Sequence, residues 1–227
     1  MLQKGICPHT KGKLSKPSFG VGVYNIYKPK GPTSYDIIRE LKKQTEEKRI
    51  GHGGTLDPLA SGVLIVAIGS EFTKQLDEIA HTDKEYLATI KLGQTSSTGD
   101  EEGEKTDIKY EKEPSENEIK TVLNLFVGKI KQTPPAYSAV KISGIPSYKL
   151  ARQGKKVPLK ERTVSIYETK FLEYNWPILK IDVKCSSGTY IRSLAEDIGK
   201  SLKTGAYLSD LVRLRVANFK IKDAIKL

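Results

Sequence analysis

Residues 51–69 constrain the fold of this chain more than any other segment. The segment begins as a glycine-dense loop containing His52 and ends in a run of branched apolar residues, which is typical of a buried strand. Asp57 lies between these two parts. Because the glycines allow close backbone approach and Pro58 restricts the turn, we expect Asp57 to lie on a pre-shaped loop beside the core.

Helix and strand signals follow one another without regular alternation. Strands are predicted over residues 21–27, 86–92, 163–174, 178–186 and 212–219. Capping-box patterns, Thr33 with Asp36 and Ser115 with Glu118, predict helices that reach about residues 46 and 126. Further helices are expected over residues 72–80 and from about residue 192 to 202. The pattern predicts an α+β fold with a mixed, mostly antiparallel central sheet flanked by helices and loops.

We expect one folded domain over residues 21–227, because no repeat or low-complexity linker divides the chain. Residues 1–20 are basic and lack periodicity, which predicts a flexible N-terminal arm. Residues 94–112 are polar and acidic and are expected to form a solvent-facing loop or hairpin. Residues 100–118, which hold nine acids and three lysines, are expected to form a variable solvent-exposed loop.

The charge balance points to a polyanionic partner. The net charge is +11, and outside residues 100–118 the chain holds 35 bases against 18 acids. Lysine and arginine side chains that neutralise phosphates release counterions, so a surplus of this size favours nucleic acid binding. A charge that only keeps the protein in solution is the alternative.

Several classes of protein lack support. Cys7 and Cys185 lie far apart, which argues against a disulfide framework and fits a reducing compartment, and Cys7 with His9 supplies too few ligands for a metal. No apolar run reaches the roughly 20 residues of a membrane helix, so we expect a cytoplasmic protein. The glycine-rich loop lacks the ending of a P-loop, and the histidine and serine spacings fit neither a metallohydrolase nor a serine hydrolase.

Asp57 is the leading candidate for catalysis, since a carboxylate acts as a nucleophile or a base. His52 lies in the same loop, Tyr86 opens a strand, and Arg192 follows Gly188 at a strand-to-helix junction. An arginine would orient the carboxylate through paired hydrogen bonds, and a tyrosine ring offers a face for a base. Taken singly, the aspartate could cap a turn, the tyrosine could pack in the core, and the arginine could form a surface ion pair.

Residues 51–62, Gly-His-Gly-Gly-Thr-Leu-Asp-Pro-Leu-Ala-Ser-Gly, resemble the catalytic motif of TruB-type tRNA pseudouridine synthases. Three more segments resemble that family and occur in the same order, namely residues 25–34, 137–141 and 185–192. The resemblance implies the pseudouridine synthase fold and isomerisation of uridine to pseudouridine at position 55 in the T-loop of tRNA, with no cofactor and no metal. It also implies that tRNA is the partner, with no membrane or obligate protein partner, and we expect a monomer.

The resemblance assigns roles to seven residues. Asp57 is implied to be the essential carboxylate, Tyr86 to stack on the everted base, and Arg192 to pair with Asp57. The RNA-binding or pocket residues implied by the motifs are His52, Tyr190, Leu211 and Lys28. Sequence does not choose between attack by Asp57 on the sugar and removal of its 2′ proton.

Two alternatives stay open. One is a related enzyme directed to ribosomal RNA by a separate guide RNA, and the other is a non-catalytic RNA-binding protein or RNA chaperone. Bacterial relatives commonly continue into a small C-terminal RNA-binding domain of the PUA type, which is not evident here, so we expect the basic arm and surplus lysines to supply phosphate contacts.

Overall fold

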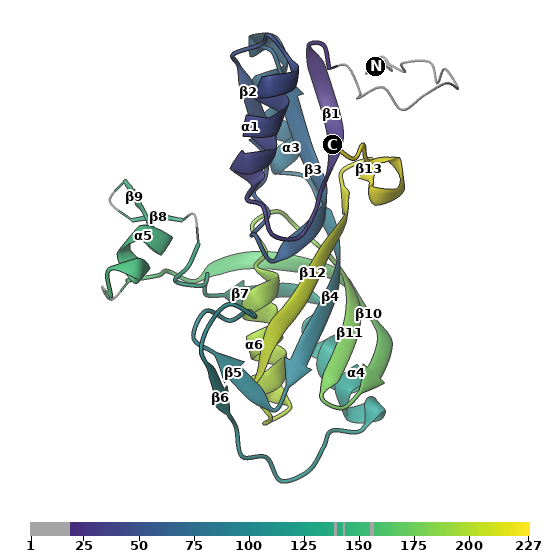
Figure 1. Ribbon diagram of the computed structural model, residues 1–227. Helices are drawn as coiled ribbons and strands as arrows, with labels where there is room; N and C mark the ends of the chain where they lie inside the picture. Colours follow the sequence, from purple (N-terminus) through teal and green to yellow (C-terminus); the bar gives the residue numbers. More distant parts are fainter. Residues whose placement is uncertain (1–18, 139, 143, 155–156) are drawn as a thin grey trace.

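The computed structural model describes residues 19–138, 140–142, 144–154 and 157–227 (Figure 1). Most of the expected N-terminal arm, with Cys7 and His9, lies outside the described residues. Phe19, at the end of that segment, is buried and packs edge-on against Tyr24, with ring centroids 5.2 Å apart. The described chain therefore joins the core two residues before the expected boundary. No helix in the described part of the chain is long and apolar enough to cross a membrane.

The described residues form one large sheet with the strand order β1-β3-β12-β4-β11-β10-β7. Its strands are β1 (Gly22–Lys28), β3 (Ala60–Ile68), β12 (Ala206–Val216), β4 (Lys84–Leu92), β11 (Ile178–Cys185), β10 (Arg162–Asn175) and β7 (Gly128–Gln132). Off this path, β2 (Ile50–Gly53) pairs with β3, and β13 (Phe219–Lys220) pairs with β12. The β12–β3 pairing is parallel, while the other ladders of this sheet are antiparallel within the described residues. The predicted α+β class with a mixed, mostly antiparallel sheet is confirmed.

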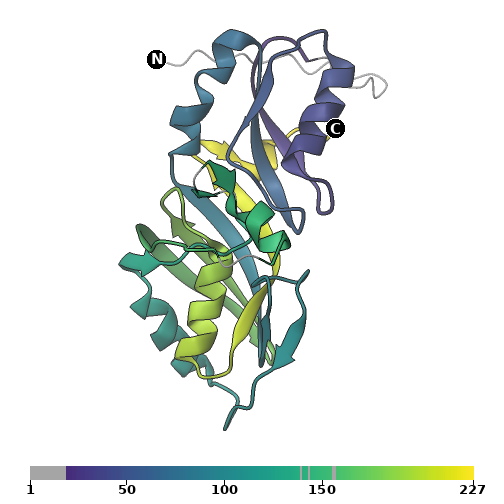
Figure 2. The ribbon, with the colours of Figure 1, turned by 90° about the vertical axis from the view of Figure 1, so that its left-hand side faces the viewer.

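Strand β3 explains the branched apolar run of the sequence. Its even-numbered residues Leu64, Val66 and Ile68 pack with the apolar face of α1 (Ser34–Gln44), and its odd-numbered residues Val63 and Ile65 pack on the other face. That other face is covered by α2 (Ser70–Thr73) and α3 (Leu76–Ala80). Figure 2 shows α1 and α3 on opposite sides of these strands. A strand covered on both faces needs apolar side chains at every position.

The other half of the sheet buries one face. Strand β4 alternates buried and half-buried residues along its length, and its buried residues join the largest core cluster. That cluster includes apolar residues of α4 (Glu116–Leu125) and α6 (Ile191–Ser201), which lie on the same side of the lower sheet in Figure 2. The period-two pattern read from the sequence therefore corresponds to a sheet with one covered face.

Capping chemistry fixes where two helices begin. Both predicted capping boxes are present: the Thr33 hydroxyl accepts from the Asp36 N–H, and the Ser115 hydroxyl accepts from the Glu118 N–H. Each acidic side chain in turn accepts from the backbone N–H of its capping residue. These contacts satisfy donors that the first helical turn leaves unpaired.

Several local expectations need correction. His52, expected in a loop, lies in strand β2 opposite Val66. The single helix expected over residues 72–80 is two short helices, α2 and α3. Residues 94–112 contain a hairpin, one of the two expected forms, made by β5 (Gln94–Ser96) and β6 (Lys105–Asp107). The β7 edge strand was not predicted. Nor was the excursion at the left of Figure 1, which contains β8 (Lys141–Ile142), β9 (Ile145–Pro146) and α5 (Ser147–Arg152). A short 3₁₀ turn, η1 (Ile221–Asp223), follows β13.

Glycine at position 62 permits the parallel contact between β3 and β12. Gly62 has a φ of +105°, and a Cβ built there would lie 2.3 Å from the carbonyl oxygen of Arg213. A side chain at this position would therefore push the two strands apart. The contact matters because β3 follows the loop that carries Asp57.

Candidate active site

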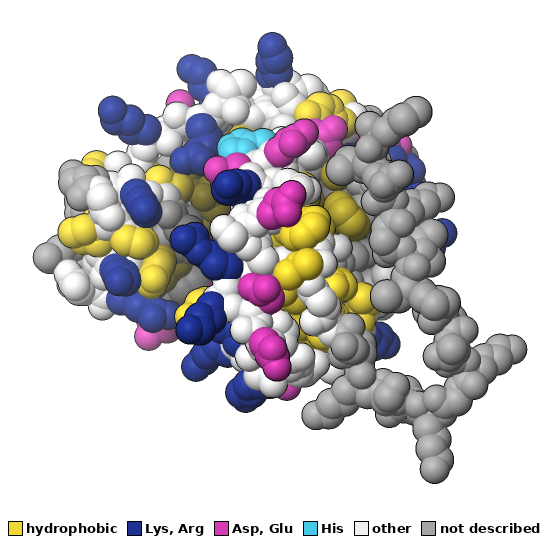
Figure 3. Space-filling view, turned by 90° about the horizontal axis from the view of Figure 1, so that it is seen from above, with side chains coloured by type: hydrophobic (Ala, Val, Ile, Leu, Met, Phe, Trp, Pro, Cys, Tyr) yellow, Lys and Arg dark blue, Asp and Glu magenta, His cyan; other side chains and the backbone are white. Residues whose placement is uncertain are grey.

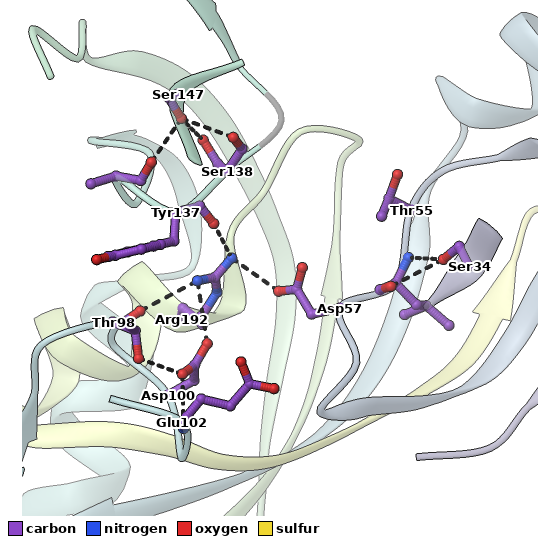
Figure 4. Close-up of polar contacts among 12 residues, drawn as sticks. Ser34, Thr55, Asp57, Thr98, Asp100, Glu102, Tyr137, Ser138, Ser147 and Arg192 are labelled. Atoms are coloured by element: carbon purple, nitrogen blue, oxygen red, sulfur yellow. Dashed lines mark hydrogen bonds and ion pairs between the residues drawn. The ribbon is translucent and has the colours of Figure 1, made fainter. Parts of the chain in front are cut away.

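The loop that carries Asp57 is fastened to the start of helix α1. The Ser34 hydroxyl accepts from the Leu56 N–H at 2.9 Å and donates to the Leu56 carbonyl at 3.0 Å (Figure 4). On the far side of Asp57, the Gly31 N–H donates to the Pro58 carbonyl at 2.8 Å. The backbone on both sides of the aspartate is thus held by another segment, so its carboxylate is placed before any ligand binds.

Arg192, in the first turn of α6, joins Asp57 to a second carboxylate. Its guanidinium lies 3.0 Å from Asp57 Oδ2 and 3.3 Å from Asp100 Oδ2. It also donates to the carbonyls of Tyr137 at 2.8 Å and Thr98 at 3.3 Å. Figure 4 shows the Asp57 carboxylate directed at this guanidinium from the right, while Asp100 reaches it from below. Acceptor oxygens from three segments, at Asp57, at Tyr137 and at Thr98 with Asp100, therefore hold the Arg192 guanidinium in place.

The two carboxylates differ in exposure. The side chains of Arg192 and Asp100 are each 7% exposed, whereas that of Asp57 is 44% exposed. Asp100 is further held by the Thr98 hydroxyl and the Glu102 N–H. The buried Arg192–Asp100 pair is therefore part of the fold, and Asp57 is the accessible end of the network.

Asp100 corrects the interpretation of the acidic segment. The sequence analysis expected residues 100–118 to face solvent, yet the first of them is buried. Its position directly after Gly99 is the only sequence signal, since Gly99 has a φ of +74° and turns the chain back toward α6. Composition alone does not separate this carboxylate from its exposed neighbours.

Tyr86 lies in β4, in the core cluster that also contains Leu56, Leu59 and Leu211. Burial raises the pKa of its phenol, the nearby Arg213 charge opposes that rise, and the Asp57 charge adds to it. The phenol is therefore neutral at physiological pH, and it lies within electrostatic reach of the Asp57 charge. The structure brings Asp57, Tyr86 and Arg192 into one region, from a loop, a strand and a helix.

Lys28 is completely buried behind this region. Its ammonium group donates to the carbonyls of Pro29 at 2.9 Å and Pro32 at 2.7 Å. Burial lowers the pKa of Lys28 to about 8, and the nearby Asp57 charge acts in the opposite direction. Lys28 thus holds the turn that contacts the Asp57 loop.

His52 and Leu211 flank the loop. His52 is half-buried, its Nδ1 has no hydrogen-bond partner among the described residues, and burial with the Arg213 charge lowers its pKa. The ring is therefore neutral at physiological pH. Leu211 is buried beside Ala60 in the parallel β12–β3 contact and opposite Ala88 of β4, in the same cluster as Tyr86.

Tyr190 is the residue before α6. Its backbone N–H and carbonyl both bind the Gln132 side-chain amide, at 2.8 and 3.0 Å. The Arg162 guanidinium lies over its ring, 5.8 Å from the centroid. Arg162 also lines a pocket of about 500 Å³, together with Lys160, Glu161 and Gly188. The predicted RNA-contact residue therefore lies under an arginine that reaches this pocket.

Arg213 was missed by the sequence analysis. It lies in β12 with 1% exposure and binds backbone carbonyls of the loop that precedes Asp57. In an alternating strand a charged residue ordinarily marks the solvent face, so the pattern gave no sign of a buried arginine.

The described residues contain no group of three or more His, Cys, Asp or Glu side chains that could hold a metal ion. Cys185 is buried, and burial raises the pKa of its thiol to about 11. That thiol is therefore a poor nucleophile.

Comparison with known proteins adds a family and several relatives. The family model for TruB family pseudouridylate synthase (N terminal domain) matches residues 42–191. tRNA pseudouridine synthase B of Clostridium acetobutylicum is 46% identical over 206 residues, which cover 91% of this chain and 71% of that protein. The protein of the same name from Francisella tularensis is also 46% identical and is covered over 68% of its length.

Solved structures agree on the fold. A chain in the crystal structure of a Cbf5–Nop10–Gar1 complex superposes with a TM-score of 0.72 at 34% identity. The match covers 91% of this chain and 52% of that chain, so this chain spans about half of that chain's length.

Proposed function

Since this chain belongs to the TruB family of pseudouridylate synthases, we propose that it converts uridine to pseudouridine at position 55 in the T-loop of tRNA. The observation that carries this proposal is the half-exposed Asp57 carboxylate held 3.0 Å from a buried Arg192. A fold-level likeness alone does not specify chemistry, and the accessible acid on a fixed cation supplies the residue that could carry the reaction.

The reaction moves one bond. The C1′–N1 bond breaks, the freed uracil turns, C5 bonds to C1′, the C5 proton leaves to solvent, and N1 takes up a proton. The nucleotide must leave its stack for this exchange, so the target base is everted into the pocket. Asp57 acts by one of two routes: attack of its oxygen on C1′, or removal of the 2′ proton. Either route needs an unprotonated carboxylate at a fixed position.

Tyr86 and Arg192 serve Asp57 in different ways. Arg192 orients the carboxylate through its fixed guanidinium. The ring of Tyr86 supplies a face for the everted uracil, and its hydroxyl takes part in removal of the C5 proton. We expect Tyr86→Phe to bind tRNA nearly as well as wild type and to turn over more slowly. Equal turnover would leave the hydroxyl without a role.

Four further residues form the surroundings of the base. His52 lies where the RNA loop enters, Leu211 walls the pocket, Lys28 braces the loop, and Tyr190 contacts RNA beside Arg162. All four assignments rest on their nearness to Asp57 or Arg192 and on the family motifs. No step in this scheme calls for a cofactor or a metal.

Basic side chains supply the contacts to phosphate. Figure 3 shows Lys and Arg side chains over one half of the upper face, with a strip of Asp and Glu beside them. We expect tRNA affinity to fall steeply as salt increases, because bound lysines and arginines release counterions. If the tRNA affinity did not change with salt concentration, the surplus of basic side chains would not be contacting RNA phosphates. We propose that residues 21–227 act as the catalytic domain, as a monomer in the cytoplasm.

Tritium release from tRNA labelled at uridine C5 tests the activity. Wild type should release tritium, Asp57→Asn should release none, and Asp197→Asn should behave as wild type. Asp197 is the matched control, since it is an acid of the same type that pairs with Lys200 on the surface of α6. Equal release by Asp57→Asn and wild type would refute the assignment of the catalytic acid.

Two rival functions are separated by the same assay. A chain of a Cbf5 complex superposes on this one, and the first rival, an enzyme that needs partners, would leave bare tRNA unmodified until those factors are added. An RNA chaperone would bind tRNA and release no tritium under any condition. Release from a bare tRNA transcript contradicts both.

A further inference from the structure

Arg213 is a buried cation held by backbone rather than by acids. Its Nε donates to the Val63 carbonyl at 2.7 Å, and its two Nη atoms donate to the carbonyls of Gly54 at 3.0 Å and Thr55 at 3.4 Å. No carboxylate of the described residues forms an ion pair with it. Removing a guanidinium from water without an acidic partner costs free energy, so the burial of Arg213 must be explained by what it binds.

The carbonyls that Arg213 binds belong to the backbone on either side of Asp57. Gly54 and Thr55 precede the aspartate by two or three residues, and Val63 lies in the strand that follows it. A Cβ at Gly54, where φ is +87°, would lie 3.6 Å from the guanidinium. The cation therefore closes the base of the loop on which the acid is carried.

The same guanidinium lies within electrostatic reach of the Tyr86 phenol. Arg213 and Tyr86 are directly opposite in the β12–β4 ladder, which puts their side chains on one face of the sheet. The Arg213 charge favours the ionised form of the Tyr86 phenol, against the effect of burial. One side chain thus binds the backbone of the Asp57 loop and lies beside the tyrosine proposed to stack on the base.

An arginine suits this place because its donors lie in one rigid plane. Five N–H groups in a fixed fork can hold several acceptors at constant spacing. A lysine would bring the same charge on a single flexible ammonium group. The geometry of the link therefore depends on the guanidinium and not only on its charge.

We propose that Arg213 is a positioning residue that sets the spacing between the Tyr86 phenol and the loop carrying Asp57. The proposal rests on the proposed function. It predicts that loss of the guanidinium slows the isomerisation of bound RNA and leaves RNA affinity nearly unchanged, because Arg213 is buried and does not itself reach the substrate.

The test compares Arg213→Lys with Arg215→Lys. Arg215 lies in the same strand and pairs with Glu85 at 3.1 Å, so it controls for loss of an arginine from β12. We expect Arg213→Lys to lower the single-turnover rate of tritium release roughly 10-fold to 100-fold, the effect of a small misplacement of reacting groups. Its tRNA Kd should stay within about 3-fold of wild type, a small change on the scale where tenfold is 1.4 kcal/mol. Arg215→Lys should match wild type in both.

A double variant separates positioning from general weakening. If Arg213 acts through Tyr86, the rate loss caused by Arg213→Lys should shrink in a Tyr86→Phe background, because the second contact is already gone. If the rate losses of the two single variants simply multiplied in the double variant, Arg213 would not act through Tyr86, and the proposal would be refuted. Loss of rate and of tRNA affinity in equal proportion would also refute it, since that result reports a damaged fold.

A second measurement needs no substitution at Arg213. In protein labelled with ¹⁵N-arginine, the Nη signals of Arg213 should shift in Tyr86→Phe, while its Nε signal, bound to Val63, should stay in place. Superimposable spectra would refute the contact. Absence of tritium release by wild type would instead refute the proposed function, so the two failures are distinguishable.

Discussion

Removing Arg192 should destabilise the fold chiefly through Asp100. In Arg192→Met the Asp100 carboxylate, 7% exposed, would remain buried without its cation. Breaking a buried ion pair from one side costs roughly 3–5 kcal/mol, so we expect the free energy of unfolding to fall by that amount. Neutralising the orphaned acid in Arg192→Met/Asp100→Asn should restore about 2 kcal/mol, since a neutral amide is cheaper to bury than a charge.

The stability of Asp57→Asn is the control for Arg192→Met, because Asp57 is the exposed acid of the same network. Its side chain is 44% exposed, and water replaces the lost partner, so Asp57→Asn should change the free energy of unfolding by less than about 1 kcal/mol while abolishing tritium release. Urea unfolding followed by Trp176 fluorescence and far-UV circular dichroism measures all three variants. The reasoning fails if the double variant is no more stable than Arg192→Met, or if Asp57→Asn costs as much as Arg192→Met.

Three further predictions concern the surroundings of the site. Burial lowers the pKa of Lys84 to about 8. As the pH rises, the Lys84 ammonium therefore loses its proton in the folded protein before it does so in the unfolded chain, and the free energy of unfolding increases. Between pH 8 and 10 the unfolding free energy of Lys84→Met should rise by roughly 2 kcal/mol less than that of wild type in urea titrations, and parallel curves would contradict this. Gly62→Ala should cost roughly 3 kcal/mol or more, because its Cβ meets the Arg213 carbonyl at 2.3 Å, and an unchanged Tm would disprove the steric argument. Ser34→Ala removes both hydrogen bonds to Leu56 and should cost roughly 1–3 kcal/mol in urea unfolding and also lower the turnover rate, whereas intact turnover would show that the loop does not need this anchor.

Local rules predicted the elements whose cause is local. The capping boxes at Thr33 and Ser115 mark the starts of α1 and α4, because the interacting residues lie three positions apart. The strand over residues 86–92 was likewise predicted because the alternation of apolar and polar residues is visible within the strand itself. His52 was misplaced because glycine suggests a loop, whereas pairing with β3 extends the chain there.

The site was predictable only as far as its motifs reach. The partnership of Asp57 and Arg192 followed from a family resemblance, not from spacing, since 135 positions separate them. Asp100 and Arg213 were missed because their burial is set by segments distant in sequence, α6 for the acid and the parallel β3 contact for the arginine. A charge beside other charges, or in an alternating strand, gives no local sign of such surroundings.

The strand order has a consequence for how the molecule is made. Strand β12 follows β3 and β4 by more than 100 positions in the sequence, yet it lies between them in the sheet. Without β12, the strands on its two sides would each have an unpaired edge. Asp57 precedes β3 and Tyr86 lies in β4, so we expect the two residues to be brought together only when β12 inserts between these strands.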